Sequence, residues 1–167
     1  MTDINKRNWI QWDEVPNCEA DEVALSKYRL SRGDLLVARM ADPGKSAIVE
    51  HDVEAVFASY LVRLMPVSRD FSLYIFGFLK SPAFFDYSQG AMTGSVQKHM
   101  NARVIAAAQL RSPAQEEVNA FNQVASPIRG QLAACVQEAQ QLRRIRDELS
   151  PLLMSGAVRV RPEEVAA

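Results

Sequence analysis

A short stretch past the middle of the chain combines a glycine with side chains that often contact nucleic acids. Thr93-Gly94-Ser95-Val96-Gln97-Lys98-His99 offers a hydroxyl, an amide and an ammonium group, and its glycine lets the backbone approach a ligand closely. Ser95 and Lys98 are suited to phosphate oxygens, and Gln97 is suited to base edges. These three residues are therefore candidate DNA contacts, although an ordinary solvated loop is the simpler interpretation of the stretch on its own.

A second candidate segment follows Asp42-Pro43-Gly44-Lys45, which has proline and glycine at the positions typical of a type II turn. Two apolar runs, Leu35 to Met40 and Ala47 to Val49, flank this turn and predict a β-hairpin. Lys45 and Ser46 would then lie at its tip, where a solvated loop is again the plain alternative. Two arginines complete the candidate DNA contacts: Arg103, and Arg39 if its side chain leaves the core face of its strand.

The sequence lacks the arrangements of residues that catalysis or metal binding requires. The two histidines, His51 and His99, do not stand at metal-ligand spacing with cysteines or carboxylates. There is no phosphate-binding glycine loop of the Walker type, no dinucleotide fingerprint and no nucleophile elbow. We therefore expect a protein that is not an enzyme and that needs neither a metal nor a cofactor.

The total charge does not indicate a nucleic-acid partner, but the charges are unevenly distributed. The chain has 19 basic and 20 acidic residues, for a net charge of −1. No acidic residue lies between Asp86 and Glu116, whereas Lys98, Arg103 and Arg111 do. A further basic stretch runs from Lys27 to Arg39. These stretches form one positive face only if the fold brings them together, and a scattered, solvated surface is the alternative.

The composition favours a cytoplasmic protein. There is no run of about 20 apolar residues and no secretory signal at the start, so we expect no membrane contact. Cys18 and Cys135 are far apart in the sequence, and we expect both to be reduced.

A long helix is predicted from about Pro113 to Ser155, with Ser112 as its N-cap and Gly156 following its C-terminus. Apolar residues recur along it at alternating spacings of three and four, and only Arg146 interrupts the pattern. A helix of about 40 residues would be about 60 Å long, which is longer than a small domain is wide. Its apolar seam is therefore expected to meet another long helix, from a second copy or a partner. Two shorter core helices, broken at Pro127, are the alternative. The residues assigned to the partner contact are Val118, Phe121, Ile128, Leu132, Leu142, Leu149 and Leu153.

Shorter elements are predicted before this helix. They are an extended lead-in from Met1 to Asp21, a strand from Val56 to Leu64, a buried helix from Phe71 to Lys80, a helix opened by Ser81-Pro82 and a short helix capped by Asn101. The order predicts an α+β fold. A small mixed β-sheet/α domain would occupy residues 1–111, the long helix residues 112–156, and a short terminal strand or tail residues 157–167.

Four ordered motifs resemble the specificity subunits of type I restriction–modification systems. YRLSRGDLLVARMADPGKSAIV resembles the hairpin of that family, and VFASYLVRLMP resembles its next strand. SPAFFDYSQGAMTGSVQKHMNARVIAAAQLRSPAQEEV resembles the passage that leads into the conserved helix of the family, and LSPLLMSGAVRV resembles the end of that helix. The resemblance covers nearly all of the chain from Lys27 to Val160.

The resemblance implies a target recognition domain that reads half of a split double-stranded DNA sequence. It also implies a conserved helix that pairs with its counterpart and docks the methyltransferase and restriction subunits. Family members usually carry two such halves, whereas this chain carries one, so we expect a homodimer that pairs through the long helix. Trp9 and Trp12 stand where the first part of the family's recognition domain should end, so this domain is expected to be shortened at its N-terminus. A degenerate module that binds a protein partner and no longer reads DNA is the alternative.

Overall fold

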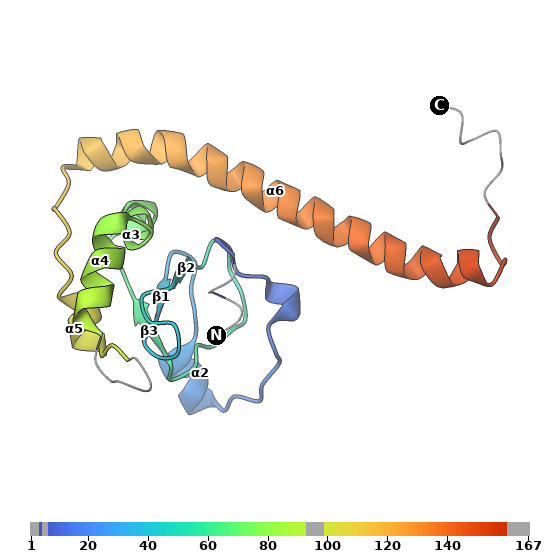
Figure 1. The fold of residues 1–167 in the computed structure, drawn as a ribbon, viewed down its shortest axis with the longest axis horizontal. Coiled ribbons are helices and arrows are strands. Elements are labelled where there is room, and N and C mark those ends of the chain that lie inside the picture. The colour runs from blue at the N-terminus through green and yellow to red at the C-terminus, as the bar shows by residue number, and fades with distance from the viewer. Residues whose placement is uncertain (1–3, 5–6, 93–98, 160–167) are drawn as a thin grey trace. The chain divides into compact units, whose positions relative to one another are not determined.

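A small α+β unit and a long helix make up the protein (Figure 1). The computed structural model describes residue 4 and residues 7–92 and 99–159. The chain divides into two compact units, Met1–Gln123 and Val124–Ala167. The first unit contains a sheet and several short helices, and helix α6 (Gln115–Met154) supplies the helical part of the second. The predicted α+β fold with a long C-terminal helix is confirmed.

The sheet has three antiparallel strands in the order β2-β1-β3. The central strand β1 (Leu35–Ala38) is buried at every position. It pairs on one side with β2 (Ser46–Ile48) and on the other with β3 (Leu61–Leu64). Because both faces of β1 are covered, its sequence is a continuous apolar run and does not alternate with polar residues.

Successive side chains of a strand point to opposite faces of the sheet, and β1 therefore contributes to two apolar clusters. Leu35 and Val37 pack on one face with residues of α3 (Ser72–Leu79), α4 (Pro82–Ala91) and α5 (Ala102–Ala106). Leu36 and Ala38 pack on the other face with the N-terminal segment and with residues that follow β2. Both clusters hold the β1–β2 hairpin in place.

The predicted hairpin is confirmed, and its turn has the expected geometry. Gly44 has a φ of +88°, as the third position of a type II turn requires. The Lys45 N–H donates to the Asp42 carbonyl at 3.4 Å, and the Gly44 N–H donates to the Ala38 carbonyl at 3.0 Å. Local sequence is sufficient to specify this turn.

The predicted helix caps are confirmed as well. The Ser81 hydroxyl accepts the Phe84 N–H at the start of α4, where Pro82 takes the first helical position. The Asn101 side chain accepts the Val104 N–H at 2.9 Å and caps α5. Satisfying one of the unpaired N–H groups of a helix start in this way stabilises the helix by about 1 kcal/mol.

Two of the sequence predictions before α3 are wrong. The strand predicted from Val56 to Leu64 is shorter than expected, and only its last four residues form β3 (Leu61–Leu64). The residues just before β3 form a turn instead, in which the Leu61 N–H donates to the Ala58 carbonyl. Val56 makes a single bridge with Arg29. The predicted extended lead-in contains the 3-10 helix η1 (Trp12–Glu14), and helix α2 (Glu22–Tyr28) follows it, capped by the Asp21 carboxylate. A second 3-10 helix, η2 (Arg69–Phe71), precedes α3.

Helix α6 begins two residues later than predicted, at Gln115, and Glu117 supplies a side-chain acceptor at its start. The Glu117 carboxylate accepts the Ala114 N–H at 2.9 Å, which is one half of a capping box. The helix continues through Pro127 and Pro151, so the alternative of two helices broken at Pro127 is wrong. Gly156, with a φ of +75°, follows the helix, and its N–H donates to the Leu153 carbonyl at 3.1 Å. This end matches the prediction.

Cys18 and Cys135 are free and exposed. Within the described residues, no helix has the length and apolar composition needed to cross a membrane. Over the same residues, no group of three or more His, Cys, Asp or Glu side chains could hold a metal ion.

Candidate functional site

The hairpin tip packs closely against α4. A Cβ atom added to Gly44 would lie 2.9 Å from the Ser88 Oγ atom, so the turn already touches the helix. Lys45 is exposed beside this contact. Ser46 is only 1% exposed, and a direct contact between its side chain and DNA is therefore not supported by its position. Of the two predicted tip residues, Lys45 is the one whose side chain reaches solvent.

Arg39 lies just past the end of β1, where three segments meet. Its N–H donates to the Tyr60 carbonyl at 3.0 Å, and its carbonyl accepts the Met100 N–H at 2.8 Å. The side chain is half-buried, and its Nε atom has no hydrogen-bond partner in the described part of the chain. These two backbone hydrogen bonds fix the position from which the Arg39 side chain extends.

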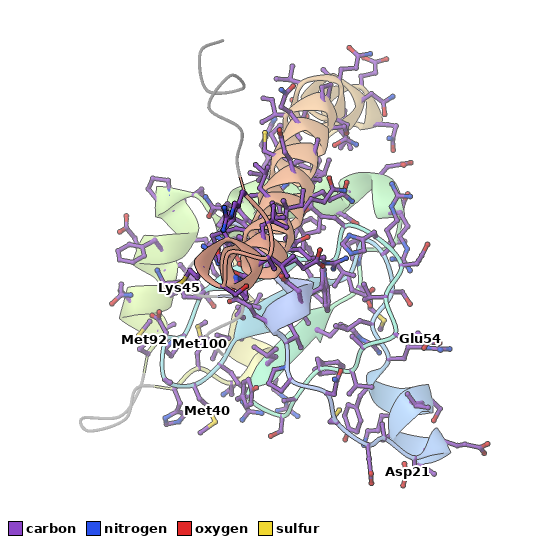
Figure 2. The ribbon with its side chains drawn as sticks, turned by 90° about the vertical axis from the view of Figure 1, so that its right-hand side faces the viewer. Asp21, Met40, Lys45, Glu54, Met92 and Met100 are labelled. Carbon is purple, nitrogen blue, oxygen red and sulfur yellow. The ribbon has the colours of Figure 1, made fainter. Side chains whose placement is uncertain are left out.

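Ser95, Gln97 and Lys98 lie outside the described residues, but the position where the chain returns from this stretch is described. His99 forms an antiparallel bridge with Met40, next to Arg39 in the hairpin. Figure 2 shows Met40, Lys45, Met92 and Met100 on one side of the molecule, and Asp21 and Glu54 on the other. His99, the last residue of the segment singled out in the sequence, therefore lies beside the hairpin.

Arg103 is exposed on α5. This helix packs against α4, because the Tyr87 hydroxyl donates to the Val104 carbonyl at 2.6 Å and Ile105 contributes to the same apolar cluster as Phe84. Arg103 is thus presented by an element that follows the His99 bridge directly.

A pocket of about 410 Å³ lies between the hairpin turn and the start of α4. We call it the hairpin pocket. Sequence reasoning missed it, and it also missed Arg7, Lys80 and Ser81, which line it together with Lys45 and Ser46. The Lys80 Nζ atom donates to the Ser46 carbonyl at 2.7 Å, which fixes the ammonium group at the pocket. Lys80 ends an otherwise apolar helix, and this position was the available signal in the sequence.

The predicted partner residues of α6 fall into two groups. Val118 is 0% exposed and Phe121 packs on Tyr74, with ring centroids 5.6 Å apart, so both contribute to the first unit. Val118 is consequently not accessible to a partner. In the second unit, Ile128 and Leu142 are 62% and 59% exposed. Leu149 and Leu153 are also exposed, and Leu132 is half-buried.

An ion pair stabilises the start of α6. The Arg111 Nη2 atom lies 2.6 Å from the Glu117 Oε1 atom. The hydrogen bond from Arg111, followed by the one from the Ala114 N–H, holds the pKa of Glu117 below its ordinary value. The same hydrogen bond raises the pKa of Arg111. Both groups are therefore charged at neutral pH, and Glu117 is favourably placed near the helix N-terminus.

The described residues offer basic and polar side chains at one end of a hairpin, and exposed apolar side chains on a long helix. No protein-family model matches this chain, and no curated protein matches its sequence.

Proposed function

We propose that this protein is a non-catalytic, sequence-specific DNA-recognition module of the type I specificity-subunit kind. The observation that carries the proposal is the pairing of Met40 with His99, the residue at which the chain returns to the hairpin. Each of the two segments singled out in the sequence carries residues suited to DNA. In this proposal the two segments act together on DNA, with the hairpin and the stretch that ends at His99 contributing to one contact.

The residues have different roles in this proposal. Lys45, Lys98 and Arg103 bind backbone phosphates, which supplies affinity without sequence preference. Gln97 reads a base edge, and Arg39 is a second candidate for direct readout. Ser95 donates to a phosphate. Ser46 has no place among the direct contacts, because its side chain is buried.

The long helix supplies the second half of the proposed function. Ile128, Leu142, Leu149 and Leu153 are exposed on α6, and they occupy positions of a repeat with alternating spacings of three and four, which is the pattern of a coiled-coil seam. We propose that two copies pair through this seam, so that two hairpins read two half-sites. A twofold dimer of this kind favours a symmetric, interrupted DNA sequence. The same helix docks the methyltransferase and restriction subunits.

Selection from a randomised duplex DNA pool, followed by sequencing, tests this proposal. The selection is run on the protein alone and together with a type I methyltransferase subunit. A two-part, symmetric motif is expected. If folded protein enriches no sequence in either condition, DNA reading is rejected, and the exposed helix seam then favours a module that binds only proteins.

Two lysine variants test the placement of the surface. Lys45→Ala and Lys98→Ala are each expected to weaken binding to all sequences and to lower the slope of log affinity against log salt by about 1. Lys27→Ala is the matched control, because Lys27 is exposed in the last turn of α2, the helix that Asp21 caps on the side opposite Lys45 in Figure 2. Equal slopes for all three variants would place the DNA surface elsewhere.

A further inference from the structure

The seam of α6 follows a seven-residue repeat, whose positions are lettered a to g with the seam at a and d. Leu132 and Ala139 lie at a, and Cys135 and Leu142 lie at d. Leu142 is 59% exposed, and Cys135 and Ala139 are exposed as well. This assignment also identifies the residues that flank the seam, at positions e and g. In a pair of helices, these flanking residues set the orientation.

The flanking positions of α6 carry charges of opposite sign on the two sides of the seam. Between Val124 and Leu153, position g holds Glu138 as its charged residue, whereas position e holds Arg129 and Arg143. The side chains of Glu138 and Arg143 are exposed. One sign of charge on each side makes the parallel and antiparallel orientations electrostatically different.

A parallel pair of two copies brings opposite charges together. In a parallel, in-register coiled coil, position g of one helix lies beside position e of the next heptad in the other helix. Glu138 of each copy then lies beside Arg143 of the second copy. The twofold symmetry of the pair makes this contact twice. The charge pattern of the chain is therefore complementary to itself in this orientation.

An antiparallel pair brings like charges together, because position e then faces e and position g faces g. If residues 121–153 of the two copies overlap fully, Glu138 lies beside Glu138 of the second copy. Arg143 lies beside Arg129 of the second copy in the same arrangement. Both contacts are repulsive, so the charges disfavour this orientation.

Arg146, the polar residue in the seam, favours one register. It lies at position a, and a polar residue at a single a position fixes the register of a coiled coil. In register, both arginines share one layer, whereas a shift by one heptad would place them in two layers, opposite Ala139 or Leu153. The Arg146 side chain is 67% exposed and lies 2.7 Å from the Asp147 carboxylate, so its charge already has a counter-ion outside the seam.

We propose that two copies of this chain pair through α6 as a parallel, in-register coiled coil, in which Glu138 of each copy contacts Arg143 of the other. The inference rests on the pairing through α6 in the proposed function, and it adds the orientation and register of that pair. The starts of the two α6 helices then lie at the same end of the coiled coil.

Exchange of the flanking charges tests the orientation, with the dimer dissociation constant measured by light scattering over a range of protein concentrations. Glu138→Lys and Arg143→Glu should each raise this constant about tenfold, because two attractive contacts become repulsive. The double variant Glu138→Lys/Arg143→Glu should restore the original value, since the pairs form again with exchanged signs. Glu148→Lys is the matched control, because it reverses the same charge at an exposed c position away from the seam.

Cysteine cross-linking gives a second, independent measurement in chains that carry Cys18→Ser. In the parallel pair the two Cys135 residues share one layer, where their Cα atoms come within the about 7 Å that a disulfide requires. Mild oxidation should therefore link Cys135 to Cys135 of the second copy. A variant with Cys135→Ser and Ala139→Cys should link in the same way through residue 139.

A mixture of these two single-cysteine chains distinguishes the orientations. In the antiparallel pair, residue 135 faces residue 139, and identical cysteines are offset along the helix axes by about 6 Å. A mixed disulfide between residues 135 and 139 would therefore overturn the parallel orientation. Tighter pairing of Arg143→Glu would overturn it as well, since the new carboxylate would lie beside Arg129. A circular dichroism spectrum confirms that each variant is folded.

The outcomes separate this inference from the proposed function. A dimer with the mixed disulfide rejects the parallel orientation and leaves the pairing through α6 in place. A protein that stays monomeric at all concentrations rejects both the orientation and the pairing. If the parallel dimer forms but selection from the DNA pool enriches no sequence, the inference stands and DNA recognition fails.

Discussion

The geometry of the hairpin tip depends on one backbone conformation. Gly44 adopts a φ of +88°, which costs a residue with a Cβ atom about 1–2 kcal/mol. In addition, a Cβ atom there would lie 2.9 Å from the Ser88 Oγ atom. The position of Lys45 relative to α4 therefore follows from the absence of a side chain at the preceding residue.

We expect Gly44→Ala to lower the free energy of unfolding by about 1–2 kcal/mol, because it combines backbone strain with the contact to Ser88. Urea unfolding measures this change. Gly90→Ala is the matched control, since Gly90 lies in α4 with no atom within 4 Å of an added Cβ. That control should stabilise the protein by about 0.5–1 kcal/mol. Equal effects of the two substitutions would contradict the assigned turn.

Asp34, the residue just before β1, has a buried carboxylate. The Asp34 side chain is 4% exposed and lies 3.8 Å from the guanidinium nitrogens of both Arg63 and Arg69. It also accepts the Ser31 N–H at 2.9 Å. It thereby connects the residues that precede β1 with β3 and with the start of the helical layer.

Asp34→Ala should destabilise the fold by about 2 kcal/mol, because it removes a charged acceptor and leaves the partly buried Arg63 without it. Chemical unfolding again gives the value. Asp147→Ala serves as the control: its carboxylate is 65% exposed and pairs with the adjacent Arg146, so a change within about 0.5 kcal/mol is expected. A small effect of Asp34→Ala would show that the ion pairs of Asp34 with Arg63 and Arg69 contribute little to the free energy of unfolding.

At the scale of single elements, the start of α6 depends on an ionised side chain. Glu117 caps the helix through the Ala114 N–H and pairs with Arg111. Its pKa is lower in the folded protein than its ordinary value, because Arg111 and this N–H donate to the carboxylate. A group with a depressed pKa stabilises the fold above its unfolded pKa, and this contribution is lost as the pH falls through the folded pKa.

Acidification should therefore loosen the first turn of α6. Following the Ala114 amide by NMR from about pH 7 to about pH 3 should show a transition below the ordinary range for glutamate. Glu117→Gln should abolish this transition, whereas Glu138→Gln, on an exposed part of α6, should leave it in place. A transition that persists in Glu117→Gln would assign it to another group.

Helix α6 contains two prolines, a residue type that disfavours helix. Proline in a helix interior removes a backbone hydrogen bond and costs about 3 kcal/mol relative to alanine. Helix α6 nevertheless contains Pro127 and Pro151. Neither proline stands at a position assigned to the partner contact, so the seam keeps its alternating three–four spacing. A helix with this spacing and exposed apolar residues is expected to be stabilised further by a partner.

At the scale of the whole molecule, the central question is self-association. Leu142 is 59% exposed in the seam of α6. Leu142→Glu should dissociate the proposed dimer, because each copy would lose the burial of a leucine, about 1.5–3 kcal/mol, and gain a buried charge. The dissociation constant should rise more than about a hundredfold.

Light scattering after gel filtration, over a range of protein concentrations, measures this effect. Gln141→Glu is the control, because it introduces the same charge one position away from the seam. If the unmodified protein is a strict monomer at all concentrations, pairing through α6 is rejected. DNA binding by such a monomer would still be compatible with the hairpin surface.

Local sequence by itself determined the parts of this protein whose geometry depends on neighbouring residues. The turn at Pro43-Gly44, the caps at Ser81 and Asn101, and the glycine end of α6 are all local hydrogen-bonded or φ-dependent features. The existence and length of α6 followed from its apolar spacing. The candidate residue Lys45 was likewise found from turn chemistry alone.

Only the tertiary structure decided which residues share a surface. In the folded protein, Ser46 is buried against the helical layer and Val118 is buried in the first unit. Lys80 lies at the hairpin pocket. It also shortened the predicted strand to β3 and brought His99 beside Met40. These outcomes depend on contacts between residues far apart in the chain. Their energies depend on the final packing, which the apolar spacing of a single segment does not contain.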